Sequence, residues 1–132
     1  MGAIYRRGCQ CGAIRYEVTG AVRQIVACLR QSGSAFGMTM VVAEEDFRIT
    51  QGKEETFAVD SDAGRQKIGG FCRQCGSRIY NWSDRLPGMI SVKPGTLDDT
   101  ISLQPQILLW TSRKQGWVAI PEGVEAYETQ PP

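Results

Sequence analysis

Short stretches of alternating or wholly apolar residues, each closed by a turn, recur along the first half of the chain. Residues 13–18 (AIRYEV) alternate between apolar and polar positions and end at Thr19-Gly20, which is the pattern of a half-buried strand. Residues 22–28 and 35–42 are rich in β-branched and large apolar side chains, which favour strands. Residues 43–47 have room for one helical turn at most.

The second half continues in the same way. Residues 48–50 and 56–59 flank a turn at 51–53 and predict a hairpin. The pattern predicts further strands at 66–71, 78–82, 89–93, 106–110 and 116–120, and an extended tail over 122–132. Because many short strands follow one another with frequent turns, the sequence predicts an all-β fold.

Length and composition narrow the class of protein. A chain of 132 residues without a repeat or a linker-like stretch predicts a single domain over 1–132, with a tail from about residue 122. A net charge of +1 offers no basic excess for nucleic acid. The sequence shows neither a secretory signal nor an apolar run of membrane-spanning length, so we expect no membrane partner and a reducing, cytoplasmic location.

Histidine is absent and cysteine occurs five times. The absence of histidine excludes Ser-His-Asp triads, Cys-His dyads and every metal site that includes an imidazole. In a reducing compartment, clustered cysteines bind metal or perform chemistry more often than they form disulfides.

Four of the cysteines form two close pairs, Cys9-Gln10-Cys11 and Cys72-Arg73-Gln74-Cys75. Zinc prefers four soft ligands in a tetrahedron, and two residues between ligands let one tight turn present both sulfurs to a single ion. Gly76 directly after the second pair permits the left-handed backbone that such a turn needs. We therefore predict one zinc ion bound by Cys9, Cys11, Cys72 and Cys75, with Arg7, Arg73 and Arg78 near enough in sequence to offset the thiolate charge.

Two other interpretations of these cysteines remain open at this point. Cys72 and Cys75 could form a thioredoxin-type redox pair, although such a pair begins a helix and the residues after Gly76 are strand-like. The cysteines could also be unconnected buried thiols.

Several segments together resemble one family. These segments are 8–16 (GCQCGAIRY), 32–36 (SGSAF), 71–77 (FCRQCGS), 95–99 (GTLDD), 110–112 (WTS) and 116–118 (GWV). Through them the chain resembles, over residues 8 to about 120, the glutathione-dependent formaldehyde-activating enzymes, a family that also includes centromere protein V. The resemblance implies antiparallel β-tent sheets around a structural zinc, and carbon–sulfur lyase activity on the adduct of glutathione and formaldehyde.

The family also carries a second, catalytic zinc on a Cys-His-Cys-x-x-Cys segment just before a Ser-Gly pair. The matching segment here, residues 26–33 (VACLRQSG), keeps only Cys28, and Leu108 occupies a strand position where many relatives have histidine. A catalytic zinc usually needs three protein ligands. The sequence thus predicts one structural zinc and names Cys28 as the candidate catalytic residue.

Three functions follow from these observations. The first is a lyase acting on S-(hydroxymethyl)glutathione or a related thiol adduct, with Arg30, Arg113 or Lys114 anchoring the glutathione carboxylates. The second is a non-catalytic, zinc-stabilised binding module. The third is a thiol-reactive protein that uses Cys28, against which stands a buried, inert thiol. Trp82, Trp110 and Trp117 could line a pocket or pack in the core.

Overall fold

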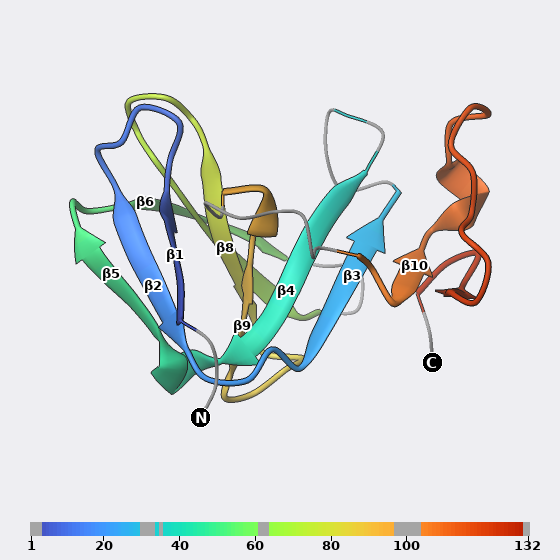
Figure 1. Cartoon of the computed structure of the whole chain (residues 1–132), viewed down its shortest axis with the longest axis horizontal. Coiled ribbons are helices and arrows are strands. Elements are labelled where there is room, and N and C mark those ends of the chain that lie inside the picture. The colour runs from blue at the N-terminus through green and yellow to red at the C-terminus, as the bar shows by residue number, and fades with distance from the viewer. Residues whose placement is uncertain (1–3, 30–33, 35, 61–63, 97–103, 131–132) are drawn as a thin grey trace.

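Two β-sheets of unequal size make up the protein (Figure 1). The computed structural model describes residues 4–29, 34, 36–60, 64–96 and 104–130. The all-β prediction is confirmed, because the regular structure of these residues consists of strands and short 3-10 turns. The strands are β1 (Ile4–Gly8), β2 (Arg15–Thr19), β3 (Gln24–Cys28), β4 (Gly37–Ala43), β5 (Phe47–Gln51), β6 (Glu55–Asp60), β7 (Gln66–Phe71), β8 (Arg78–Ser83), β9 (Met89–Val92), β10 (Ile107–Leu109) and β11 (Glu125–Ala126).

Three 3-10 helices connect strands: η1 (Glu44–Asp46), η2 (Pro94–Thr96) and η3 (Thr111–Arg113). The first of them is the single turn that the sequence allowed after β4. Across the described part of the chain, no helix has the length and apolar character needed to cross a membrane.

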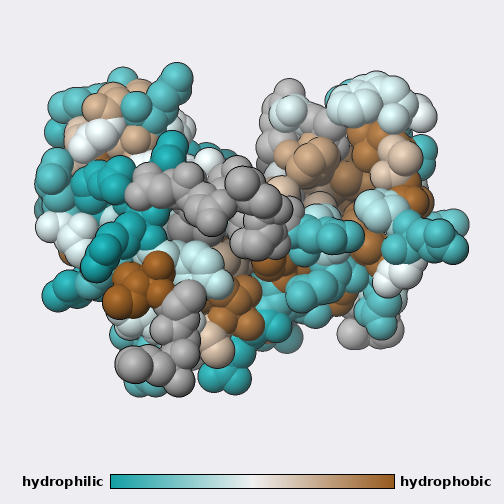
Figure 2. All heavy atoms as spheres, in the orientation of Figure 1, coloured by the Kyte–Doolittle hydropathy of each residue, from teal (hydrophilic) through white to brown (hydrophobic). Residues whose placement is uncertain are grey.

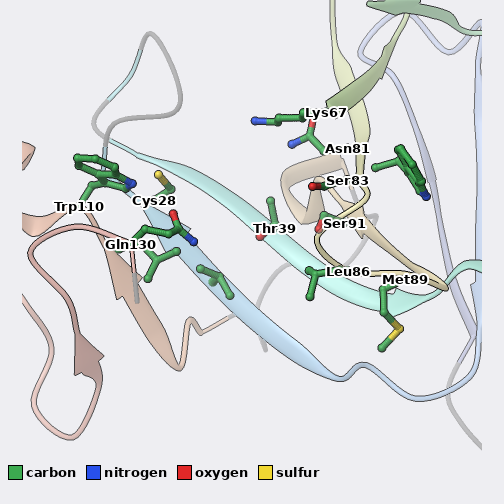
Figure 3. Close-up of a pocket in the computed structure, with 13 residues that line it drawn as sticks. Cys28, Thr39, Lys67, Asn81, Ser83, Leu86, Met89, Ser91, Trp110 and Gln130 are labelled. Carbon is green, nitrogen blue, oxygen red and sulfur yellow. The ribbon is translucent and has the colours of Figure 1, made fainter. Parts of the chain in front are cut away.

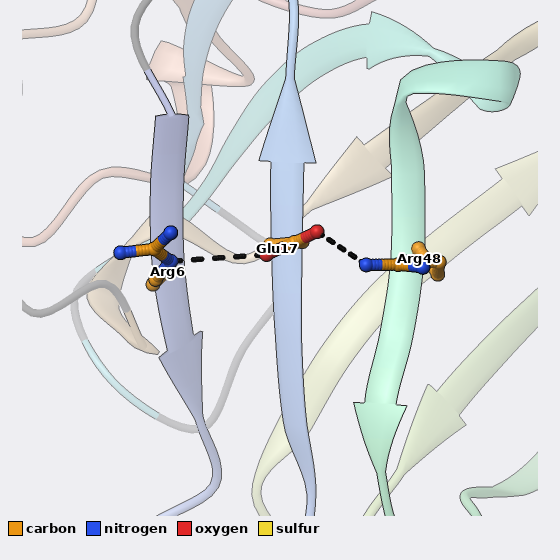
Figure 4. Close-up of polar contacts among 3 residues, drawn as sticks. All are labelled: Arg6, Glu17 and Arg48. Atoms are coloured by element: carbon orange, nitrogen blue, oxygen red, sulfur yellow. Dashed lines mark hydrogen bonds and ion pairs between the residues drawn. The ribbon is translucent and has the colours of Figure 1, made fainter.

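The smaller sheet has the order β1-β2-β5 and is antiparallel throughout. Alternation along β2 sends Tyr16 and Val18 into the interior and leaves Glu17 on the outer face. There Glu17 lies between two cationic residues of the neighbouring strands, 3.7 Å from Arg6 Nε and 2.6 Å from Arg48 Nη2 (Figure 4). Since both arginines are well exposed, each pair contributes at most about 1 kcal/mol and mainly supports the register of the sheet.

The larger sheet has the order β11-β10-β3-β4-β9-β8-β7-β6. Its pairs are antiparallel except at one edge, where β10 lies parallel to both β3 and β11. The expectation of an extended tail over 122–132 is wrong in part, because β11 folds back onto β10. The backbone N–H of Tyr127 donates to the Leu108 carbonyl at 2.9 Å, which continues this edge beyond β11.

The hairpin predicted around residues 51–53 does not form. β5 pairs with β2 in the smaller sheet, whereas β6 pairs with β7 in the larger one. The turn therefore carries the chain from one sheet to the other. Gly52 adopts φ +79° there, and a Cβ at this position would overlap the carbonyl of Ala13.

The main core lies between the two sheets. Its buried members are Cys9, Ile14, Tyr16, Val18, Ile25, Met40, Val42, Cys72, Ile79, Ile90 and Val92. Polar contacts close one end of it, where the Tyr16 hydroxyl lies 2.6 Å from Thr96 Oγ1. Because Thr96 already donates to the Lys93 carbonyl at 2.6 Å, the Tyr16 hydroxyl is the donor of this bond.

A second, smaller core lies under the C-terminal edge and consists of Ala27, Leu29 and Leu108. The strand predicted at 116–120 is absent: a turn occupies this segment, and the N–H of Val118 donates to the Gln115 carbonyl at 3.0 Å. Trp117 is 74% exposed and Ile120 is 42% exposed. Apolar residues accordingly show at the surface over the C-terminal part in Figure 2, while the visible face of the smaller sheet is mostly hydrophilic.

Candidate metal centre and pocket

Four cysteine sulfurs converge where the two sheets meet. Cys9 and Cys11 belong to the turn after β1, and Cys72 and Cys75 to the turn between β7 and β8. The Sγ atoms of Cys9 and Cys11 are 3.6 Å apart, those of Cys11 and Cys72 are 3.7 Å apart, and all four lie within 4.8 Å of one another. A tetrahedron with zinc–sulfur bonds of about 2.3 Å has edges of about 3.8 Å, so the cluster could hold one metal ion.

Two tight turns present these sulfurs. The N–H of Gly12 donates to the Cys9 carbonyl at 3.1 Å, and the N–H of Gly76 donates to the Cys72 carbonyl at 2.8 Å. Both glycines have positive φ, +82° at Gly12 and +77° at Gly76. The left-handed backbone predicted at Gly76 is confirmed, and Gly12 adopts the same conformation after the other pair.

Hydrogen bonds stabilise the ionised sulfurs. The Ile14 N–H donates to Cys9 Sγ at 3.3 Å, and the Ser77 hydroxyl lies 3.2 Å from Cys75 Sγ. The Ser77 hydroxyl, together with backbone N–H groups of Ser77 and Cys11, lowers the pKa of Cys75 to about 5. By contrast the pKa of Cys11 rises to about 11: the Ala13 N–H has the largest single effect and lowers it, but the Cys9, Cys75 and Cys72 sulfurs and burial together outweigh that bond. Such a cluster loses all its protons readily only when a cation takes their place.

Ser77 also joins the two halves of the centre, a role that the cysteine spacing did not reveal. Its hydroxyl oxygen accepts the Gln10 N–H at 3.2 Å while the hydroxyl faces Cys75. Two of the three arginines expected to offset the thiolate charge contact other groups. Arg73 lies 3.8 Å from Glu55, and Arg78 stacks 4.6 Å above the centroid of the Phe57 ring.

The competing interpretations of the four cysteines are wrong. A redox pair of the thioredoxin type begins a helix, whereas the Cys72–Cys75 turn leads into strand β8. Unconnected thiols are contradicted by the gathering of all four sulfurs at one point.

Cys28, the candidate catalytic residue, lies elsewhere, at the end of β3. It lines a cavity of about 470 Å³ between the C-terminal edge and strands β4, β7, β8 and β9. Figure 3 shows the Cys28 sulfur beside the Trp110 ring, with Lys67 and Asn81 on the opposite wall. Leu108, where many relatives have histidine, is buried among Ala27 and Leu29 and does not line this cavity.

The tryptophans take the roles foreseen for them only in part. Trp82 and Trp110 line the cavity, whereas Trp117 is mostly exposed. Trp110 has φ +60°, a left-handed backbone that bulky side chains rarely adopt. Strain of this kind persists where the surrounding structure fixes the residue, and it often marks a functional site.

The basic residues expected to anchor a ligand are not those that the cavity presents. Arg113 and Lys114 come after Trp110, in and just beyond η3, and are not part of the described lining, while Arg30 lies outside the described residues. Lys67 and Asn81 line the cavity instead. Nothing local in the sequence distinguished them, since they come opposite Cys28 only through the strand order β3-β4-β9-β8-β7 of the larger sheet.

The two sheets and the cysteine cluster define an all-β protein with a centre that could bind a metal ion. The chain belongs to the glutathione-dependent formaldehyde-activating enzyme family, whose sequence profile matches residues 4–113. Among solved structures it is similar to the crystal structure of a Rhodobacter sphaeroides protein, a structural-genomics target. The two share 20% sequence identity at a TM-score of 0.55, over 76% of this chain and 91% of the other, a likeness of fold. No curated protein matches the chain.

Proposed function

We propose that this protein is a zinc-stabilised carbon–sulfur lyase that acts on S-(hydroxymethyl)glutathione or a related thiol adduct in the Cys28 pocket. The observation that supports this proposal most directly is the cavity. Cys28, the one cysteine outside the four-cysteine cluster, lines it together with the strained Trp110. Its volume of about 470 Å³ lies in the range of small-molecule sites, roughly 300–1,000 Å³.

Zinc is the metal that the four-cysteine centre fits best. Four thiolates at tetrahedral separations suit zinc, and a closed set of four protein ligands is typical of a structural ion. Bound there, the ion would join the turn after β1 to the turn before β8, and would thereby hold the two sheets together. Zinc binding requires reduced thiols, which supports a reducing compartment such as the cytoplasm. The core shared by both sheets supports one domain over residues 1–132.

A catalytic zinc ion does not fit the surroundings of Cys28. Among the described residues, the cavity lining supplies one thiol, and its other polar groups are hydroxyls, amides, two indoles, the Met89 thioether and the Lys67 ammonium. We therefore assign the chemistry to Cys28 directly. Its thiolate would take the hydroxyl proton of the adduct as the carbonyl of formaldehyde forms. The electron pair of the breaking C–S bond would return to the glutathione sulfur, which would then receive that proton from Cys28.

The second candidate is a binding module without catalysis. The same donor set favours it, because the family's zinc chemistry would have no ion beside Cys28. In this case the pocket would bind the thiol compound and release it unchanged.

The experiment measures the rate at which S-(hydroxymethyl)glutathione releases formaldehyde, with and without protein, for the wild type and for Cys28→Ala. The lyase predicts a rate above the uncatalysed background that Cys28→Ala abolishes while zinc content and fold are kept. A wild-type rate equal to background, together with retained glutathione binding, establishes the module instead. Two zinc ions per chain would contradict the assignment of the chemistry to Cys28 alone.

A further inference from the structure

The wall of the pocket opposite Cys28 carries polar groups that the proposed lyase chemistry does not use. Lys67 of β7 and Asn81 of β8 stand on this wall, with the hydroxyl-bearing residues Ser83 and Ser91 next to them. Figure 3 shows the Lys67 amine and the Asn81 amide nitrogen both directed toward the side of the cavity that carries Cys28.

Asn81 is buried, with 5% of its surface exposed, and only one of the two polar atoms of its side-chain amide has a hydrogen-bond partner among the described residues. Its amide oxygen accepts a hydrogen bond from Arg78 Nη2 at 3.0 Å. Its amide nitrogen has no hydrogen-bond partner among the described residues. Because Arg78 fixes the oxygen, the amide must present its two N–H donors on its other side. A buried donor left without an acceptor is unfavourable, so this nitrogen is suited to an acceptor that arrives with a ligand.

The charges near Asn81 are positive. Burial lowers the pKa of Lys67, and the nearby Arg78 lowers it further. Burial also lowers the pKa of Lys93, with added repulsion from Arg78 and Lys67. Within the described part of the chain no carboxylate pairs with Lys67, and none lines the cavity. The wall opposite Cys28 thus combines positive charge with hydrogen-bond donors, a combination that attracts an anion.

We propose that Lys67 and Asn81 form a subsite that binds the carboxylate of a small ligand. The Lys67 ammonium supplies the charge, and the Asn81 amide supplies a directed donor to one carboxylate oxygen. A ligand anchored there extends toward Cys28 and Trp110 across the cavity. The inference deepens the proposed function, since it adds a requirement for a carboxylate to a pocket already assigned to a thiol compound.

The test measures binding of S-methylglutathione by calorimetry, because this probe keeps both carboxylates and has no reactive thiol. We expect Lys67→Met to weaken binding about tenfold or more, as for loss of a charge-assisted hydrogen bond. The exposed Lys53→Met is the matched control and should bind as the wild type does. Asn81→Asp keeps an acceptor for Arg78 but replaces the donor with a negative charge, so it should weaken binding at least as much. The dimethyl ester of the probe should bind weakly and without dependence on Lys67.

The outcomes separate this inference from the proposed function. Equal binding of acid and ester, equal binding by Lys67→Met and Lys53→Met, or no binding of the probe by the wild type would each overturn the subsite. Adduct cleavage could still be intact in the first two cases, and the lyase would then stand without the subsite. Conversely, if probe binding depends on Lys67 but the protein has no lyase activity, the result supports the subsite and contradicts the lyase proposal.

Discussion

Replacing Cys72 with serine is the most direct perturbation of the metal centre. Cys72 is 1% exposed, and its sulfur lies 3.7 Å from that of Cys11. Serine is nearly isosteric but is a poor zinc ligand at neutral pH. The substitution should leave three thiolates around a weakened site and uncouple the turn before β8 from the turn after β1.

The size of the expected effect follows from the loop that a bound ion would close. Cys11 and Cys72 are 61 positions apart, and a cross-link over such a loop, treated as a disulfide would be, removes about 4 kcal/mol of chain entropy from the unfolded state. Whole domains are stable by only about 5–15 kcal/mol. Loss of this one connection should therefore lower the free energy of unfolding by a large fraction of its total.

Urea denaturation with equimolar zinc, together with elemental analysis, measures both consequences. At a typical slope of about 1–3 kcal/mol per molar urea, the midpoint should fall by about 2 M. Cys28→Ser provides the matched control, since it alters a cysteine outside the cluster and should keep one zinc ion and the wild-type midpoint. The reasoning is refuted if Cys72→Ser retains one tightly bound zinc ion and unfolds at the same urea concentration as Cys28→Ser.

Three further predictions concern packing, a buried hydrogen bond and pH. Gly69→Ala should destabilise the fold by about 1–3 kcal/mol in urea denaturation, because the new methyl would overlap the Phe57 ring, while Gly116→Ala, which meets nothing within 4 Å, should have little effect. Tyr16→Phe should cost about 1 kcal/mol by removing the bond to Thr96, and comparable losses in Tyr16→Phe and the control Tyr5→Phe would contradict this role for the hydroxyl. Burial lowers the pKa of Lys93 from 10.5 to about 8, so between these values the unfolded chain holds more protons and the free energy of unfolding should rise with pH. Lys93→Met should flatten that rise, and an unchanged slope would show that other groups cause it.

The fold class and the clustering of the four cysteines could be predicted because their signals are local. Alternation in residues 13–18 specifies one strand without reference to its partner. Likewise the spacing of Cys72 and Cys75 with Gly76 behind them specifies a turn. Because a structural zinc ion needs four ligands, the sequence also predicted that the two cysteine-bearing turns lie together.

The failures concern pairing over long distances. The turn at 51–53 was consistent with a hairpin, yet β5 and β6 find partners in different sheets because Ile49 and Phe47 pack on the core beside Tyr16. Residues 116–120 have strand-like composition and form a turn instead. The position of Lys67 and Asn81 opposite Cys28 was equally hidden, since it depends on how the five adjacent strands β3, β4, β9, β8 and β7 align.

Because the protein has two cores, the free energy of local opening at the Cys28 pocket differs from the free energy of global unfolding. Cys28 pairs with Leu109 along the parallel edge, and the Leu29 N–H donates to the Leu109 carbonyl at 3.0 Å. This edge rests on the small cluster of Ala27, Leu29 and Leu108, which differs from the main core although Met38 packs against both. Strands β10 and β11 can thus open as a local unit while the rest of the two sheets stays folded. A bound ligand that contacts both Trp110 and Lys67 would stabilise the closed form of this edge. Amide hydrogen exchange at Leu29 would then slow in proportion to the fraction of protein that has ligand bound.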